Sequence, residues 1–166
     1  MARGRDGGMA ATLGAGAVAG SLATGAMSAV MFGARRLGLM GEMPPEKITA
    51  RFLDRLGWTS RSSRTQDLMA TITHVGFGAA AGSLFAILER RLRPPAPPVL
   101  AGVGFATGVW LVSYQGWVPA LGIMAPPSRD RPGRPQSMLV AHLVFGAVLG
   151  ALLGRPPKER EAPAPD

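Results

Sequence analysis

The chain has 166 residues, of which 47% are hydrophobic and 17% are charged, and its formal net charge is +8. It contains no cysteine, which excludes disulfides, thiolate nucleophiles and cysteine-ligated metal or iron–sulfur centres. Because the Lys and Arg residues flank apolar stretches, anionic lipid headgroups explain the positive charge more simply than nucleic acid does. We therefore expect a lipid bilayer as the partner of this chain, and no nucleic acid.

Four long stretches contain no Asp, Glu, Lys or Arg: residues 8–34, 68–88, 94–128 and 136–154. A transmembrane helix needs about 20 apolar residues, and a soluble helix would show polar residues at every third or fourth position. The sequence therefore predicts an all-α fold, an integral membrane four-helix bundle that forms a single domain. The predicted spans are about 8–31, 68–88, 99–118 and 137–154.

The first of these stretches follows Arg3 and Arg5, a pattern that a cleavable signal peptide also shows. It is longer than the apolar core of a typical signal peptide, and short patterns in it recur in the third stretch. We therefore predict that it is a membrane-spanning helix that the protein retains.

A short interfacial helix is predicted in the first loop, over about residues 45–56. Ile48, Phe52 and Leu56 recur there at helical spacing, with charged residues on the opposite face. Gly57 follows as a stop signal. A helix with this pattern is expected to lie flat at the membrane surface.

Aromatic and capping residues mark the expected ends of the spans. Trp58, Tyr114 and Trp117 are predicted to lie in the headgroup region on the side of the first loop. Ser63 and Gln66 have the spacing of a capping box, which predicts the start of the second span. Beyond the last span, residues 155–166 are rich in Pro, Ala and charge, and we expect them to be disordered.

The two histidines of the chain stand in one shared pattern, H-x-x-F-G-A-x-x-G-x-L, which begins at His74 and again at His142. A Leu-Gly-[Leu/Ile]-Met pattern also occurs twice, at residues 37–40 and 121–124. The shared order predicts two parallel two-helix repeats, related by a pseudo-two-fold axis along the membrane normal. The two histidines are then expected at the same depth in the membrane.

Small residues recur at every fourth position in the predicted spans. Glycines follow each histidine at i+4 and i+8, so that histidine and glycines share one helix face. In lipid, such faces let helix backbones approach closely. The glycines expected at these helix contacts are Gly16, Gly20, Gly78, Gly82, Gly104, Gly108, Gly146 and Gly150.

His74 and His142 are the candidate cofactor-binding residues, because an ionisable side chain inside a span usually faces a partner or a cavity. Three functions stay open. In the favoured one the chain is a non-enzymatic scaffold or accessory subunit, whose histidines hydrogen-bond across helices. In the second they ligate a haem or a metal ion, which the sequence does not specify. In the third the chain is a small oligomeric carrier or pore. The predicted spans are unbroken and contain no charged residue, which argues against this third function.

No paired carboxylates occur in the spans, so we expect no enzyme activity. A protein partner would be another membrane protein or a second copy of this chain. Three arginines, Arg90, Arg91 and Arg93, crowd the short second loop. By the positive-inside rule, this density favours a cytoplasmic location for that loop and for both termini.

The chain also resembles the uncharacterised bacterial inner-membrane proteins related to YagU. The resemblance rests on a glycine-rich first helix, the Pro-Pro-Glu-Lys element at residues 44–47, Thr-His-x-x-Phe at 73–77 and Ala-His-Leu-Val-Phe at 141–145. It implies a multi-pass protein of the bacterial inner membrane with His74 and His142 at family-like positions. It implies no activity.

Overall fold

The computed structural model describes residues 3–58, 62–92 and 94–154, with side chains from residue 8 onward. The predicted disordered tail, 155–166, lies outside the described residues. Every regular element in the described part of the chain is helical. In chain order the elements are α1 (Arg3–Arg36), α2 (Pro44–Arg55), α3 (Ser63–Leu92), α4 (Pro98–Trp110), the π-helix η1 (Leu111–Trp117), α5 (Val118–Ala120), the 3-10 turn η2 (Pro127–Arg129) and α6 (Arg134–Leu153).

Four helical segments are long and apolar enough to cross a membrane: Gly8–Arg36, Ser63–Leu92, Pro98–Ala120 and Arg134–Leu153. The prediction of four apolar helices is therefore confirmed, although the helices generally extend beyond the predicted limits. Arg, Glu and Gln are good helix formers, so the backbone stays helical where the apolar sequence stops. For the same reason the second span begins at Ser63, before the predicted start at residue 68. The residue that caps it is Ser62, whose hydroxyl accepts the Thr65 N–H at 3.3 Å. The predicted capping box at Ser63 is wrong by one residue.

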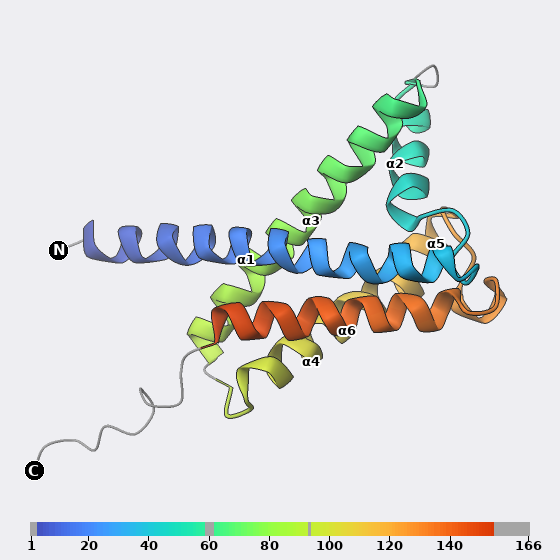
Figure 1. The fold of residues 1–166 in the computed structure, drawn as a ribbon. Coiled ribbons are helices and arrows are strands. Elements are labelled where there is room, and N and C mark those ends of the chain that lie inside the picture. The colour runs from blue at the N-terminus through green and yellow to red at the C-terminus, as the bar shows by residue number, and fades with distance from the viewer. Residues whose placement is uncertain (1–2, 59–61, 93, 155–166) are drawn as a thin grey trace, which may run out of the picture.

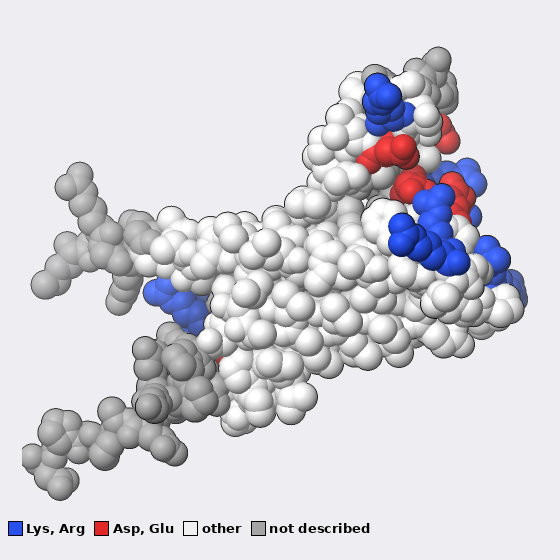
Figure 2. Space-filling view, in the orientation of Figure 1, with Lys and Arg blue, Asp and Glu red and all other residues white. Residues whose placement is uncertain are grey.

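The long helices pack in a fixed order: α3 against α1, α1 against α6, and α6 against α4. Figure 1 shows that α1 and α6 run antiparallel, so that α1 begins and α6 ends at the same end of the molecule. The Ser63 end of α3 diverges from α1, and α2 packs against this diverging half. On the face drawn in Figure 2, Lys, Arg, Asp and Glu gather towards the two ends and leave an uncharged belt between them.

Glycines form the contacts within two of these helix pairs. A Cβ atom on Gly16 of α1 would lie 2.6 Å from the carbonyl oxygen of Gly82 in α3, and one on Gly20 would overlap the carbonyl oxygen of Gly78. In the second pair, a Cβ atom on Gly146 of α6 would overlap the carbonyl oxygen of Gly102 in α4. No larger side chain fits at these positions unless the two backbones separate.

Two of the glycines expected at helix contacts are not there. Gly104 and Gly108 have no other atom within 4 Å of the place where a Cβ would stand. The contact runs instead through Gly102, which is buried against Gly146 and Gly150. Because two residues along an α-helix are about 200° apart, Gly102 and Gly104 face opposite sides of α4, and only one of them can face α6.

The third span is not a continuous α-helix, contrary to the expectation of unbroken spans. Leu111–Trp117 is a π-helix, in which the Val118 N–H donates to the Ser113 carbonyl five residues back. Gly116 has φ −101° and ψ −105°, outside the helical region. Pro119, two residues after the π-helix, has no N–H to donate to an i−4 carbonyl, which disfavours regular α-helical bonding here.

The two Leu-Gly-[Leu/Ile]-Met segments have the same backbone geometry. Gly38 and Gly122 adopt left-handed φ angles of 76° and 66°. In each turn the next residue donates its N–H to a carbonyl five residues back, Leu39 to Ala34 at 2.9 Å and Ile123 to Val118 at 3.1 Å. These are Schellman motifs, which end α1 and α5. Each motif delivers a methionine, Met40 or Met124, into the core.

The helix predicted in the first loop is present as α2. The Glu46 carboxylate accepts the Met43 N–H at 3.3 Å, and Pro44 occupies the first turn, where its missing N–H has no consequence. At the other end Gly57 has φ 75°. The location of α2 at the membrane surface stays a prediction.

Candidate functional site

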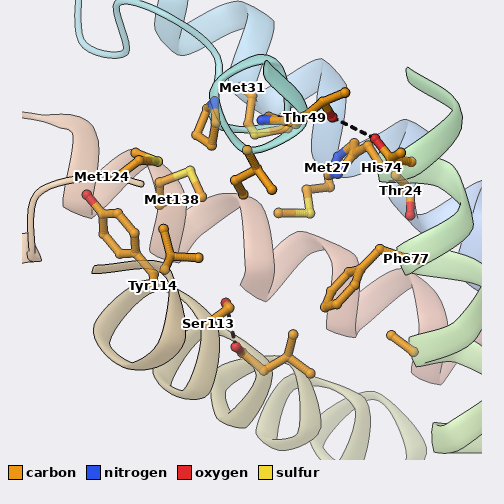
Figure 3. A pocket seen from close by; sticks show the side chains of 18 of the residues that line it. Thr24, Met27, Met31, Thr49, His74, Phe77, Ser113, Tyr114, Met124 and Met138 are labelled. Carbon is orange, nitrogen blue, oxygen red and sulfur yellow. Dashed lines mark hydrogen bonds between the residues drawn. The ribbon is translucent and has the colours of Figure 1, made fainter. Parts of the chain in front are cut away.

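A cavity of about 510 Å³ lies where α3 and α2 diverge from the rest of the bundle (Figure 3). All four candidate spans and α2 contribute to its lining. No Lys, Arg, Asp or Glu is among the described residues that line it. Ten of the described lining residues are methionines or aromatic residues: Met27, Met31, Met69, Met124, Met138, Phe52, Phe77, Tyr114, Trp117 and Phe145.

Both predicted site histidines line this cavity, His74 from α3 and His142 from α6. His142 is 7% exposed, and its Nδ1–H donates to the Met138 carbonyl at 2.8 Å. The Nε2 atom of His74 is buried and has no hydrogen-bond partner among the described residues. The structure thus brings both histidines to one site.

The expected hydrogen bonds from histidine across helices are not present in the described part of the chain. The Met138 carbonyl that His142 contacts is four residues back on the same helix. Thr24 of α1, which also lines the cavity, donates to the Gly20 carbonyl of its own helix at 2.8 Å. His142 therefore keeps an unused ring nitrogen, Nε2, at the cavity, whereas the unpartnered Nε2 of His74 is enclosed by protein.

At the edge of the cavity, α2 is joined to α3 by a pair of hydroxyl groups. The Oγ1 atoms of Thr49 and Thr73 lie 2.8 Å apart in a hydrogen bond (Figure 3). Thr73 also contacts the Met69 carbonyl at 2.8 Å, which orients its hydroxyl. Because Thr73 directly precedes His74, this contact fixes the backbone that carries the unpartnered imidazole.

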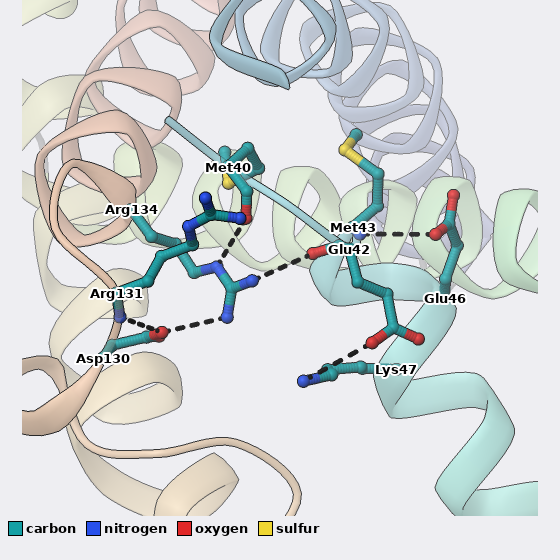
Figure 4. A network of polar contacts seen from close by, with 8 residues as sticks. All are labelled: Met40, Glu42, Met43, Glu46, Lys47, Asp130, Arg131 and Arg134. Carbon is teal, nitrogen blue, oxygen red and sulfur yellow. Dashed lines mark hydrogen bonds and ion pairs between the residues drawn. The ribbon is translucent and has the colours of Figure 1, made fainter. Parts of the chain in front are cut away.

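A buried polar cluster adjoins the cavity at Tyr114. The Tyr114 hydroxyl donates to the Asp130 carboxylate at 2.6 Å, and Arg134 forms an ion pair with the same carboxylate at 2.9 Å. The Arg134 guanidinium also donates to the carbonyls of Met40 at 2.8 Å and Glu42 at 3.4 Å (Figure 4). This cluster fastens the first loop to the third.

The three aromatic residues predicted for the headgroup region differ in how exposed they are. Tyr114 is only 2% exposed, because its hydroxyl bonds to Asp130 inside the protein, and its depth relative to the headgroups stays a prediction. Trp117 is half-buried and lines the cavity. Trp58 is 49% exposed just after α2. The polar cluster itself was missed, since nothing in the sequence indicates that Asp130 and Arg134 are buried.

The donor set does not support the haem or metal alternative. Among the residues that the structure describes, no group of three or more His, Cys, Asp and Glu could hold a metal ion. A haem carries two carboxylates, which are expensive to bury without cations, and no Lys or Arg is among the described residues of the lining. What the cavity can do is hold an uncharged, largely apolar molecule.

Comparison with known proteins gives a family and no activity. No curated protein and no solved structure matches the chain. No finding links it to the YagU-related proteins, so that resemblance stays a prediction. A family model described as a family of unknown function, DUF6789, matches residues 10–164. The chain therefore belongs to the DUF6789 family.

Proposed function

We propose that this chain is a non-enzymatic, multi-span protein of the bacterial inner membrane that holds an apolar molecule from the bilayer. The observation that carries the proposal is the cavity, whose volume of about 510 Å³ lies within the range of small-molecule sites. Its lining is drawn from all four candidate spans, so an occupant would reach it from the hydrocarbon region.

The chemistry of the lining supports binding rather than catalysis. Apart from the two imidazoles and Tyr114, no ionisable side chain is found among the described lining residues. An acid–base reaction needs a group that holds and returns a proton near a reacting atom, usually positioned by a second polar residue. Here Tyr114 is already bound to Asp130 and His142 to its own helix. The proposal therefore keeps the non-enzymatic expectation.

We also propose that the four spans form two parallel two-helix repeats, and that both termini lie in the cytoplasm. Two features support the pairing: α1 with α3 and α4 with α6 both make close glycine contacts, and both Leu-Gly-[Leu/Ile]-Met turns are Schellman motifs. A protein that holds a lipid-soluble molecule in such a cavity is suited to act as an accessory subunit. Its partner would be another membrane protein or a second copy of this chain.

A carrier is the second candidate, and one observation favours it. The third span is broken at Gly116, and residues of its π-helix, Ser113 and Tyr114, line the cavity. Broken spans beside a binding site are typical of transporters. The buried pair of Asp130 and Arg134 also weakens the sequence argument against a carrier.

The test of binding uses Trp117 as a reporter, because it lines the cavity. Trp58 and Trp110 are replaced by Phe, and the purified protein in detergent is titrated with 1-bromo-4-octylbenzene, whose bromine quenches tryptophan. We expect saturable quenching. Ser113→Phe, which fills the cavity, should weaken binding about tenfold, the equivalent of roughly 1.4 kcal/mol. Val112→Phe, on the exposed side of the same segment, is the matched control and should not.

Quenching that rises linearly and never saturates would indicate simple partition into the micelle and would refute the proposal. Equal effects of the two Phe variants would place the probe outside the cavity.

A further inference from the structure

We propose that the occupant of the cavity presents a phenolic hydroxyl to His142, which makes it an alkylated phenol or hydroquinone. The inference rests on the proposed function, because it names the class of molecule that the cavity holds. It follows from the hydrogen-bonding state of the His142 imidazole and from the other side chains of the lining.

His142 is an acceptor towards the cavity. Its Nδ1 donates a proton to the Met138 carbonyl, so the neutral ring has a lone pair on Nε2. The ring is neutral because no carboxylate is among the described lining residues, and an unpaired buried cation is unfavourable. A ligand that satisfies Nε2 must therefore donate a hydrogen bond. A hydroxyl does so, whereas an ether, ester or quinone carbonyl does not.

His74 lies beside the same cavity but is not the partner of the hydroxyl. Its Nε2 atom is enclosed by protein and is not open to an occupant. The need for a hydrogen-bond donor therefore comes from His142 alone, and a carbonyl oxygen does not meet it.

The other lining residues favour an occupant that has an uncharged aromatic ring. Phe77, Phe145 and Trp117 offer ring faces and edges, and the methionine sulfurs make favourable contacts with aromatic rings. No Lys or Arg among the described lining residues is available to pair with a carboxylate or phosphate, which disfavours fatty acids and phospholipids. The apolar side chains of α2, such as Ile48 and Leu53, face the same space and suit an alkyl tail.

The experiment compares 4-nonylphenol with 4-nonylanisole, which differ by one methyl group that removes the O–H donor. Each displaces 1-bromo-4-octylbenzene from the protein that retains only Trp117. We expect the phenol to bind about tenfold more tightly than the anisole, the effect of one hydrogen bond in a buried site. In His142→Leu the phenol should lose this advantage, while in His142→Gln, which retains an acceptor, part of it should remain.

Binding of 1-bromo-4-octylbenzene distinguishes a failure of the inference from a failure of the proposed function. If 1-bromo-4-octylbenzene binds but phenol and anisole bind equally, the inference is overturned and the proposed function stands; water would then satisfy the His142 imidazole. If the probe does not bind at all, the proposed function fails first. His142→Leu is informative only through its own phenol-to-anisole ratio, and its folding is checked by its affinity for the bromo probe. A third ligand, 1-dodecanol, tests the ring: binding as tight as that of 4-nonylphenol would overturn the aromatic part.

Discussion

The contact between α4 and α6 predicts opposite effects for two glycines in one helix. A Cβ atom on Gly102 would overlap the carbonyl oxygen of Gly146 and lie 2.9 Å from the Gly150 nitrogen. Non-bonded carbon atoms prefer separations of about 3.5–4.0 Å, and carbon–oxygen contacts are only slightly shorter, so in Gly102→Ala the two helices must move apart by about 1 Å or more. Overpacking of this kind lowers the free energy of unfolding by about 1–3 kcal/mol. A Cβ on Gly104 meets no atom within 4 Å.

Gly104→Ala should therefore raise the free energy of unfolding by about 0.5–1 kcal/mol, because alanine restricts the unfolded chain more than glycine does. The two variants are expected to differ by about 1.5–4 kcal/mol. Stability is measured by titrating the protein from dodecyl maltoside into SDS and following helicity by circular dichroism. In α3, Gly82→Ala and Gly76→Ala should repeat the contrast, since only Gly82 abuts another helix. Equal stabilities of the Gly102 and Gly104 variants would refute the packing argument.

The buried ion pair and the topology provide two further tests. Asp130→Ala leaves the Arg134 guanidinium buried without its carboxylate and should lower the free energy of unfolding by about 3–5 kcal/mol; Arg134→Met in the same chain should recover part of that loss in the SDS titration. A fully stable Asp130→Ala variant would contradict the burial of the pair. Alkaline phosphatase fused after Gly41 and after Asp166 should report opposite compartments, and equal activity would rule out four spans.

The features predicted correctly from the sequence are those set by neighbouring residues. Hydropathy and length act over about 20 residues, which is enough to identify four apolar helices. Turn chemistry acts over about six residues, and both Leu-Gly-[Leu/Ile]-Met segments do end helices. The position of the two histidines at one cavity agrees with their shared pattern, although the cavity itself has no local signal.

The errors concern which face of a helix meets which neighbour. A spacing of four residues selects a face but does not say whether it points to lipid or to protein, so Gly104 and Gly108 satisfied the pattern while Gly102 makes the contact. The burial of Tyr114 has no local signal either, because the group that accepts its hydroxyl hydrogen bond is Asp130, sixteen residues later. That partner becomes visible only when the third loop is folded back over the bundle.

The ion pairs of this protein differ in how strongly dissolved salt acts on them. Arg35 and Glu46 form a pair at 3.4 Å with side chains 49% and 33% exposed, so counterions reach it and physiological ionic strength weakens it. Arg134 and Asp130 are 8% and 5% exposed, beyond the reach of most counterions. The fastening of the first loop to the third by Arg134 therefore holds at high ionic strength, whereas the attachment of α2 to the end of α1 loosens as salt rises.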